Sequence, residues 1–256
     1  MKTVILAGGL GTRLSEMTSM IPKPMIEIGS LPMVHHIMEH YFSFGYKEFV
    51  LALGYKAEVI KKYFADFSLR HSDCSIDLST GEVEFHQKTI PSWKVHLINT
   101  GLTTETGGRI KRLSKWLSKE TFFLTYGDGL SDIDLSSLLA FHKRHGKLAT
   151  VTAVRPTARF GHLALKENAV INFSEKAQNM EGWISGGFFV LEPEVLSYIE
   201  NDQTIWEKGP LEKLALEGEL MAYPHEGFWK SMDTLKDQRD LENLCFRADI
   251  PWKRKF

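Results

Sequence analysis

Three glycines and an arginine lie close together near the start of the chain, in the stretch Leu6-Ala-Gly-Gly-Leu-Gly-Thr-Arg13. The stretch follows Thr3-Val-Ile5, a β-branched run that is typical of a buried strand. Glycine accepts positive φ angles and lets a ligand approach the backbone, so the amide N–H groups of such a loop can surround phosphate oxygens. Arg13 and Lys23 add positive charge beside the loop. These residues indicate a site for a polyanion such as a nucleoside triphosphate.

The sequences of two familiar phosphate-binding loops do not match this stretch. A Walker loop requires Lys-Ser/Thr after its last glycine, whereas Gly11 is followed by Thr12 and Arg13. A dinucleotide loop counted from Gly9 requires a third glycine at the position of Leu14, which disfavours a nicotinamide dehydrogenase. An ordinary glycine-rich turn is the plain alternative, and the nearby Arg13 and Pro-Lys-Pro triplet argue against it.

Two aspartates follow short apolar runs. Asp128 comes after Phe122–Tyr126 and stands between glycines, and Asp233 comes after Phe228–Met232. Ligands bind beyond the carboxyl ends of parallel strands, and carboxylates next to phosphate oxygens are ligands that Mg²⁺ prefers. Taken alone, Asp128 fits an Asp-Gly turn equally well, and Asp233 fits a helix N-cap. The residues by themselves leave these roles open.

Strand and helix patterns alternate along the chain and must position these side chains. An apolar helical stripe over 33–44, a buried strand over 48–53 and a second helix over 57–64 predict parallel βαβ units. We expect an excursion with a hairpin within 74–99. Further strands are expected over 121–125, 149–154, 162–165, 170–173, 184–191, 220–223 and 228–232, and further helices over 135–145, from 193, over 210–217 and over 234–246. The fold class is therefore α/β, a Rossmann-like, mixed and mainly parallel sheet flanked by helices.

The composition of the chain disfavours some classes of binding partner. The 256 residues can bury a core as one domain, and a net charge of -1 gives no electrostatic footprint for nucleic acid or for an anionic membrane. The first apolar run is too short for a signal sequence or a membrane span, so we expect a cytoplasmic protein. Cys74 and Cys245 are far apart, without the spacing of a metal or redox site.

Several motifs together carry a family resemblance over nearly the whole chain. They are the glycine loop, Pro22-Lys-Pro24, Thr106-Gly-Gly-Arg109, Tyr126-Gly-Asp-Gly129, Gly186-Gly-Phe-Phe-Val190 and Met232-Asp-Thr234. In these the chain resembles the sugar-1-phosphate nucleotidylyltransferases, and within that family it is most similar to members that use CTP and glucose 1-phosphate. The resemblance implies the nucleotide-diphospho-sugar transferase fold as a single domain over 1–256, with a nucleotide-binding half over about 1–130 and a sugar-binding half over about 131–256.

The resemblance also implies an activity. It is Mg²⁺-dependent transfer from CTP to glucose 1-phosphate, which gives CDP-glucose and pyrophosphate for polysaccharide biosynthesis, by a homo-oligomer. The implied catalytic residues are Arg13, Lys23, Asp128 and Lys176, and Asp128 and Asp233 are the implied metal ligands. The implied nucleotide-binding residues are Leu6, Ala7, Gly8, Gly9, Gly11, Thr12, Arg13, Lys23, Thr104, Gly108, Arg109, Gly127 and Asp128. The implied sugar-binding residues are Tyr126, Glu175, Lys176, Ser185, Gly186, Gly187 and Trp206.

Arg109 is the implied reader of the base. Cytosine presents O2 and N3 as adjacent acceptors, which a guanidinium can engage, whereas uracil places an N3–H donor there. A solvated arginine at a helix start, or a phosphate contact, is the alternative. Lys176 is implied to contact the sugar phosphate and Glu175 the sugar hydroxyls.

Two positions depart from the family pattern. Ala177 replaces the usual proline after Glu-Lys, and Ser185 replaces the usual asparagine before Gly-Gly-Phe-Phe-Val. Another sugar 1-phosphate, or UTP or dTTP, therefore remains open. A non-catalytic regulator that binds sugar nucleotides is a further alternative, which the joint presence of the charged site residues disfavours.

Overall fold

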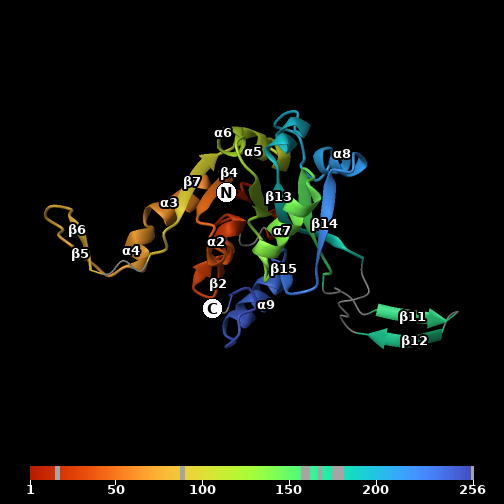
Figure 1. The fold of residues 1–256 in the computed structure, drawn as a ribbon. Coiled ribbons are helices and arrows are strands. Elements are labelled where there is room, and N and C mark those ends of the chain that lie inside the picture. Colours follow the sequence, from red (N-terminus) through yellow and green to blue (C-terminus); the bar gives the residue numbers. More distant parts are fainter. Residues whose placement is uncertain (15–17, 87–89, 157–161, 167–168, 175–181, 255–256) are drawn as a thin grey trace.

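The computed structural model describes residues 1–14, 18–86, 90–156, 162–166, 169–174 and 182–254. Its centre is a seven-stranded sheet in the order β14-β10-β13-β8-β1-β4-β7 (Figure 1). In that order the strands are Leu220–His225, Ala149–Val154, Ile184–Leu191, Phe122–Tyr126, Thr3–Ala7, Glu48–Leu53 and Lys94–Asn99. Only β13 runs against its neighbours β8 and β10, and the other pairs are parallel. The α/β fold class, with a mixed and mainly parallel sheet, is confirmed.

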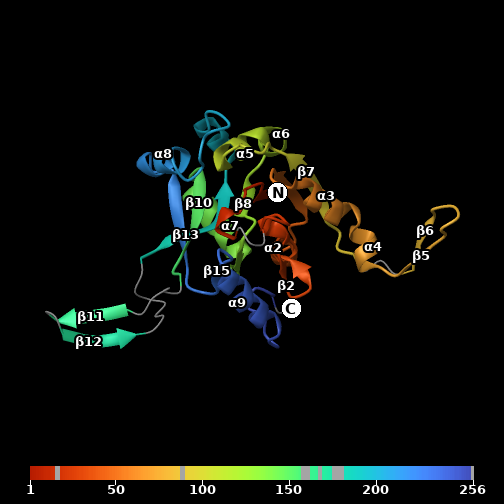
Figure 2. The ribbon, with the colours of Figure 1, turned by 180° about the vertical axis from the view of Figure 1, so that it is seen from behind.

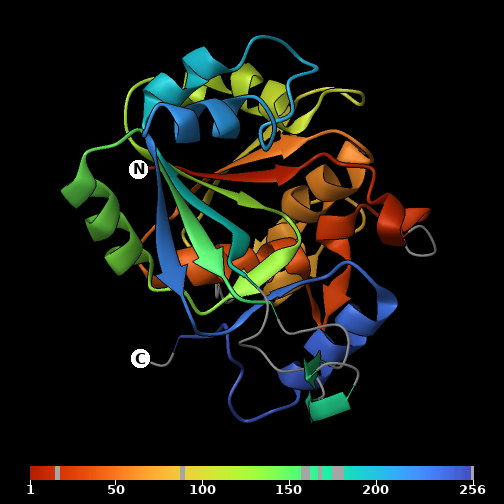
Figure 3. The ribbon, with the colours of Figure 1, turned by 90° about the vertical axis from the view of Figure 1, so that its right-hand side faces the viewer.

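Helices cover both faces of the sheet (Figure 3). Alternate residues of each central strand explain this, because Ile5 and Ala7 of β1 belong to one buried cluster whereas Val4 and Leu6 belong to another. The first cluster includes side chains from α2 (Met33–Ser43), α3 (Ala57–Ala65), α7 (Leu135–His145) and α9 (Leu235–Cys245), with α4 (Phe67–His71) beside α3. The second includes side chains from α5 (Thr106–Arg112), α6 (Ser114–Leu117), η3 (Pro193–Tyr198) and α8 (Pro210–Leu216).

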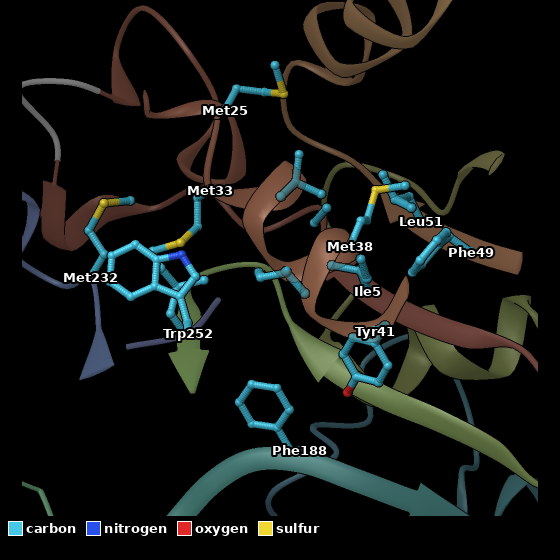
Figure 4. Close-up of a cluster of buried hydrophobic side chains, with 14 of the residues drawn as sticks. Ile5, Met25, Met33, Met38, Tyr41, Phe49, Leu51, Phe188, Met232 and Trp252 are labelled. Carbon is cyan, nitrogen blue, oxygen red and sulfur yellow. The ribbon is translucent and has the colours of Figure 1, made fainter. Parts of the chain in front are cut away.

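Methionines of the first cluster fix segments that lead to charged residues. Met25, Met33 and Met232 all belong to it, together with the fully buried Trp252 (Figure 4). Met25 closes the short 3-10 helix η2 (Lys23–Met25), and Met232 directly precedes Asp233. Burial of an apolar side chain of this size stabilises a fold by about 1.5–3 kcal/mol, so these segments are held firmly to the core.

Small strand pairs lie outside the main sheet. They are β2 with β3 (Glu27–Ile28 and Leu31–Pro32), β5 with β6 (Cys74–Ile76 and Val83–Phe85), β9 with β15 (Gly129–Ser131 and Trp229–Ser231), and β11 with β12 (His162–Lys166 and Ala169–Ser174). The β5–β6 and β11–β12 hairpins project from the core in opposite directions (Figures 1 and 2).

Most of the expected elements are present, with two corrections. The hairpin of the 74–99 excursion is confined to β5 and β6, because Lys94–Asn99 joins the main sheet as strand β7, parallel to β4. The helix expected from Pro193 is a 3-10 helix. The strand expected over 228–232 is present as β15, which pairs with β9 outside the main sheet. Both cysteines are free thiols, and within the described residues no helix has the length and apolar composition needed to cross a bilayer.

Candidate active site

A pocket of about 520 Å³ opens at the carboxyl edge of the central strands. Strands β1, β4 and β8 end together there, since Ala7 pairs with Leu53 and Leu6 pairs with Tyr126. The pocket is lined by Leu6, Ala7, Gly8, Gly9, Gly11, Thr12, Lys23, Pro24, Thr104, Glu105, Thr106, Arg109, Tyr126, Gly127, Asp128 and Asp233. The structure thus brings the glycine loop and both predicted metal ligands to one place, as an open α/β sheet requires.

A short strand pair aligns the two aspartates. Gly129 of β9 lies opposite Ser231 of β15, so the residue before β9 and the residues after β15 meet. The backbone N–H of Met232 donates to the backbone oxygen of Asp128 at 2.9 Å. The Ser231 hydroxyl donates to Oδ2 of Asp233 at 2.9 Å. Asp128 and Asp233 are therefore held in a fixed relation although they are far apart in the sequence.

Lys23 joins the two carboxylates. Its Nζ lies 2.7 Å from Oδ2 of Asp128 and 3.0 Å from Oδ1 of Asp233. Burial alone would lower the pKa of Lys23, but the charges and hydrogen bonds of the two aspartates outweigh burial and raise the pKa above its usual value. Lys23 is therefore a protonated ammonium held between two anions.

The two aspartates form a donor set that suits magnesium. Both present carboxylate oxygens to one cation, and Mg²⁺ favours a few such ligands with its other positions filled by phosphate and water. Within the described residues no cluster of three or more His, Cys, Asp and Glu side chains could hold a metal by itself. The pair thus fits a metal that arrives with a polyphosphate.

The helix after Asp233 has its own cap. Thr234 is the N-cap of α9, and it forms a capping box with Asp237, whose carboxylate accepts from the backbone N–H of Thr234 at 2.9 Å. The N-cap role that the sequence left open for Asp233 therefore belongs to its neighbour. The Asp233 side chain instead reaches Lys23 in the pocket.

Arg109 lies on α5, and only 4% of it is exposed. Its Nη1 donates to the backbone oxygen of Leu53 at 3.2 Å, to Oγ1 of Thr100 at 2.8 Å and to the backbone oxygen of Gly101 at 2.7 Å, and Nη2 donates to the backbone oxygen of Leu102 at 3.3 Å. The guanidinium therefore forms hydrogen bonds with the ends of both β4 and β7. The alternative that Arg109 is a solvent-exposed arginine at a helix start is wrong. Its Nε and the second hydrogen of Nη2 have no acceptor among the described residues.

Gly108 does not line the pocket. A Cβ at this position would lie 2.4 Å from the backbone oxygen of Asp202 and 2.6 Å from its Cα. Glycine is required there so that α5 can pack closely on the loop that contains Asp202. The structure therefore gives Gly108 a packing role, one residue before Arg109, and its role in nucleotide binding stays a prediction.

The sugar-binding role predicted for Trp206 is wrong. Its side chain is fully buried in the second core cluster, where it meets the ring of Phe189 edge to face at 6.2 Å, so it cannot close the sugar side. Its neighbour Glu207, the second residue of the Trp-Glu pair that matches the family pattern, accepts a hydrogen bond from Tyr126, and its other carboxylate oxygen accepts from the Thr106 hydroxyl at 2.7 Å.

The remaining sugar-side residues either belong to β13, outside the lining of the pocket, or lie outside the described residues. Ser185 is exposed on β13, the backbone oxygen of Gly186 accepts from Nε1 of Trp229 at 2.8 Å, and Gly187 packs on the ring of Tyr126 with φ +76°. Glu175, Lys176, Ala177 and the side chain of Arg13 lie outside what the structure describes.

The family model described as "Nucleotidyl transferase" matches residues 2–230. The chain belongs to the nucleotidyl transferase family. This nucleotidyltransferase is 49% identical over 254 residues to the glucose-1-phosphate cytidylyltransferase of Salmonella typhimurium and 44% identical to a probable glucose-1-phosphate cytidylyltransferase of Bacillus subtilis, with 99% of each chain covered in both cases. The crystal structure of HddC from Yersinia pseudotuberculosis shares its fold, with a TM-score of 0.70 at 24% identity over 94% of this chain and 98% of that chain.

Proposed function

We propose that this nucleotidyltransferase transfers a cytidylyl group from CTP to glucose 1-phosphate, which gives CDP-glucose and pyrophosphate. The observation that carries the proposal is the meeting of Lys23, Asp128 and Asp233 at the glycine-lined pocket. The full-length similarity to glucose-1-phosphate cytidylyltransferases supports the choice of both substrates. We also propose that the enzyme acts in the cytoplasm as a homo-oligomer, in polysaccharide biosynthesis.

The proposed reaction depends on the positioning of the two substrates and does not require a general base. The phosphate of a sugar 1-phosphate is already ionised near neutral pH, so its oxygen attacks the α-phosphorus of CTP in line without a covalent intermediate on the protein. The amide groups of the glycine loop and Arg13 hold the β- and γ-phosphates. Lys23 and Lys176 offset the repulsion between the two anionic substrates, and removal of one such cation costs about 3 kcal/mol in the transition state.

Magnesium fits the pair Asp128 and Asp233, and when bound it neutralises charge on the triphosphate. Asp128 is one-third exposed at the pocket, whereas Asp233 is more deeply buried, with 15% of its side chain exposed. Both line the pocket, and Asp128 is the more accessible of the two to incoming substrates. Their alignment by β9 and β15 preorganises both before any substrate binds.

The base is read by Arg109. The two donors that the backbone leaves over, on Nε and Nη2, can meet O2 and N3 of cytosine, and Thr104 lines the same wall. Because the rest of the guanidinium is fixed by backbone acceptors, these donors cannot turn away to suit an N3–H group. Hydrogen-bonding sites of this kind discriminate by roughly 10⁴-fold or more.

The sugar is held by Tyr126, Ser185, Gly186 and Gly187 together with Glu175 and Lys176. Tyr126 has a firm position, because Glu207 accepts from its hydroxyl and Gly187 leaves room for its ring. Burial raises the pKa of Tyr126, and the nearby charge of Glu207 raises it further, so the phenol stays protonated as a donor.

The test is pyrophosphate release with Mg²⁺ over a grid of nucleotides and sugars. The nucleotides are CTP, UTP, dTTP, ATP and GTP, and the acceptors are the 1-phosphates of glucose, mannose, galactose and N-acetylglucosamine. We expect one strong combination, CTP with glucose 1-phosphate. Turnover of CTP with another sugar would overturn the sugar assignment and direct attention to Ala177 and Ser185. A folded protein that binds CTP without turnover on the whole grid would instead favour a regulator.

A further inference from the structure

Lys23 occupies the space in which a cation shared by Asp128 and Asp233 must lie. Its Nζ is 2.7 Å from one carboxylate and 3.0 Å from the other. A divalent cation held by the same two oxygens would need that space and would be repelled by the ammonium charge. The ammonium and the metal therefore cannot occupy the pair at the same time.

The side chain of Lys23, and not its backbone, is the part that is able to move. Pro22 and Pro24 flank the residue, Met25 is buried in the core, and Gly127 packs on the ring of Pro24 so closely that a Cβ there would lie 2.8 Å from Cγ. The four-carbon stem keeps its rotatable bonds. Displacement of the ammonium thus needs only rotamer changes.

A nearby destination exists for the displaced ammonium. A Cβ built on Gly11 would lie 3.3 Å from Cβ of Lys23, so the lysine stem runs beside the glycine loop. A triphosphate bound on that loop offers several anionic oxygens as new acceptors within reach of the same stem. The nucleotide can therefore take the ammonium from the aspartates.

We propose that Lys23 holds the place of the metal in the nucleotide-free enzyme, so that a divalent cation binds Asp128 and Asp233 only when a triphosphate draws the ammonium away. This inference rests on the proposed function, because it assigns a new task to a residue of that site. It makes the affinity for free metal low and couples metal binding to nucleotide binding. The enzyme thereby avoids a metal-loaded pocket that lacks a substrate.

The test is binding of Mn²⁺ alone, without nucleotide, followed by the electron paramagnetic resonance signal of free Mn²⁺. We expect the Lys23→Met variant to bind Mn²⁺ at least about tenfold more tightly than the wild type, within the range of couplings between linked sites. The double variant K23M/D128N should lose this gain, which places the bound ion on the aspartates. Lys23→Arg keeps the charge and should bind Mn²⁺ as weakly as the wild type.

A matched control removes a lysine elsewhere. Lys147 pairs with Glu219 at 3.0 Å outside the pocket, so Lys147→Met changes the net charge equally and should leave Mn²⁺ affinity unchanged. An equal gain in Lys147→Met, or no gain in a folded Lys23→Met, would overturn the proposal. Should Lys23→Met fail to fold, Lys23→Gln serves the same comparison with a polar, uncharged side chain.

The Mn²⁺ titration and the test of the proposed function can succeed or fail independently of each other. Mn²⁺ affinity is measured without nucleotide or sugar, whereas the substrates are identified by pyrophosphate release from the wild type. A blank substrate grid would leave the metal titration interpretable, and an unchanged metal affinity would leave the substrate assignment standing.

Discussion

The guanidinium of Arg109 lies where the side chain of Gly8 would be. A Cβ on Gly8 would come within 2.3 Å of Nη1 of Arg109 and 2.9 Å of the backbone nitrogen of Gly54. The loop that is proposed to bind phosphate and the residue that is proposed to read the base are therefore in direct contact. Any residue larger than glycine at position 8 would displace one of the two.

We predict that Arg109→Ala relaxes the preference for CTP and also destabilises the fold. The guanidinium donates to four acceptors at the ends of β4 and β7, and loss of hydrogen bonds from a charged donor costs about 2 kcal/mol or more. The measurements are the ratio of kcat/KM for CTP and UTP and the midpoint of denaturant unfolding. Arg112→Ala is the control, because Arg112 is exposed on the same helix and pairs with Asp202. An unchanged CTP/UTP ratio would place base recognition elsewhere.

We predict that Asp128→Asn abolishes turnover, to below about one-thousandth of the wild-type kcat, while the fold is kept. The amide removes one of the two charges that meet Lys23 but retains the size of the side chain. Pyrophosphate release gives the activity, and circular dichroism gives the fold. Asp132→Asn is the matched control, because Asp132 lies near the same short strand but pairs with His225 outside the pocket. Normal turnover in a folded D128N enzyme would refute the metal assignment.

We predict that Trp206→Phe lowers stability without weakening sugar binding. The indole is fully buried, so the smaller ring leaves a cavity that costs about 1–3 kcal/mol. Thermal unfolding and the KM for glucose 1-phosphate are the two measurements. A raised KM at unchanged stability would restore the role in sugar binding that the sequence suggested.

We predict that acid destabilises the protein in part through His40. Burial lowers the pKa of His40 to about 4 from its ordinary value of 6.5, so between these two pH values the unfolded chain takes up a proton that the folded chain does not. The contribution of neutral His40 to the free energy of unfolding is therefore fully present above pH 6.5. It is lost as the pH is lowered toward 4, by roughly 3 kcal/mol for this group. Burial also lowers the pKa values of His36 and His142.

The contribution of His40 is isolated by His40→Gln, which removes the titrating ring. We expect unfolding midpoints measured from pH 7.5 to pH 4.5 to fall less steeply in the variant than in the wild type. Equal slopes for the two proteins would show that His40 contributes nothing to acid sensitivity.

The sequence was sufficient for elements with a strong periodic signal. The helix α2 and the strand β10 were predicted to within one residue at each end, and the run predicted for β1 ended at Ile5, two residues before the strand does. Strand β7 was less clear because it lies at the sheet edge and is only half-buried, so its alternation also fits a solvated hairpin. Its pairing with β4 depends on distant residues that a local pattern does not contain.

The site was predictable in its residue types and less so in its geometry. Glycines, lysine and aspartates in motifs were enough to indicate phosphate and metal chemistry. The three-residue strands β9 and β15, which align Asp128 with Asp233, are too short to show a period. Trp206 illustrates the opposite limit, because a lone tryptophan next to a motif fits a core as well as a ligand site, and only its burial distinguishes the two.

The β9–β15 pair also sets when the enzyme becomes complete during synthesis. On the ribosome the glycine loop, Lys23 and Asp128 emerge first, and β9 must wait for β15, which arrives about a hundred residues later in translation. Until then Lys23 has only one of its two carboxylate partners. A pocket that contains both aspartates therefore exists only after nearly the whole chain has been synthesised.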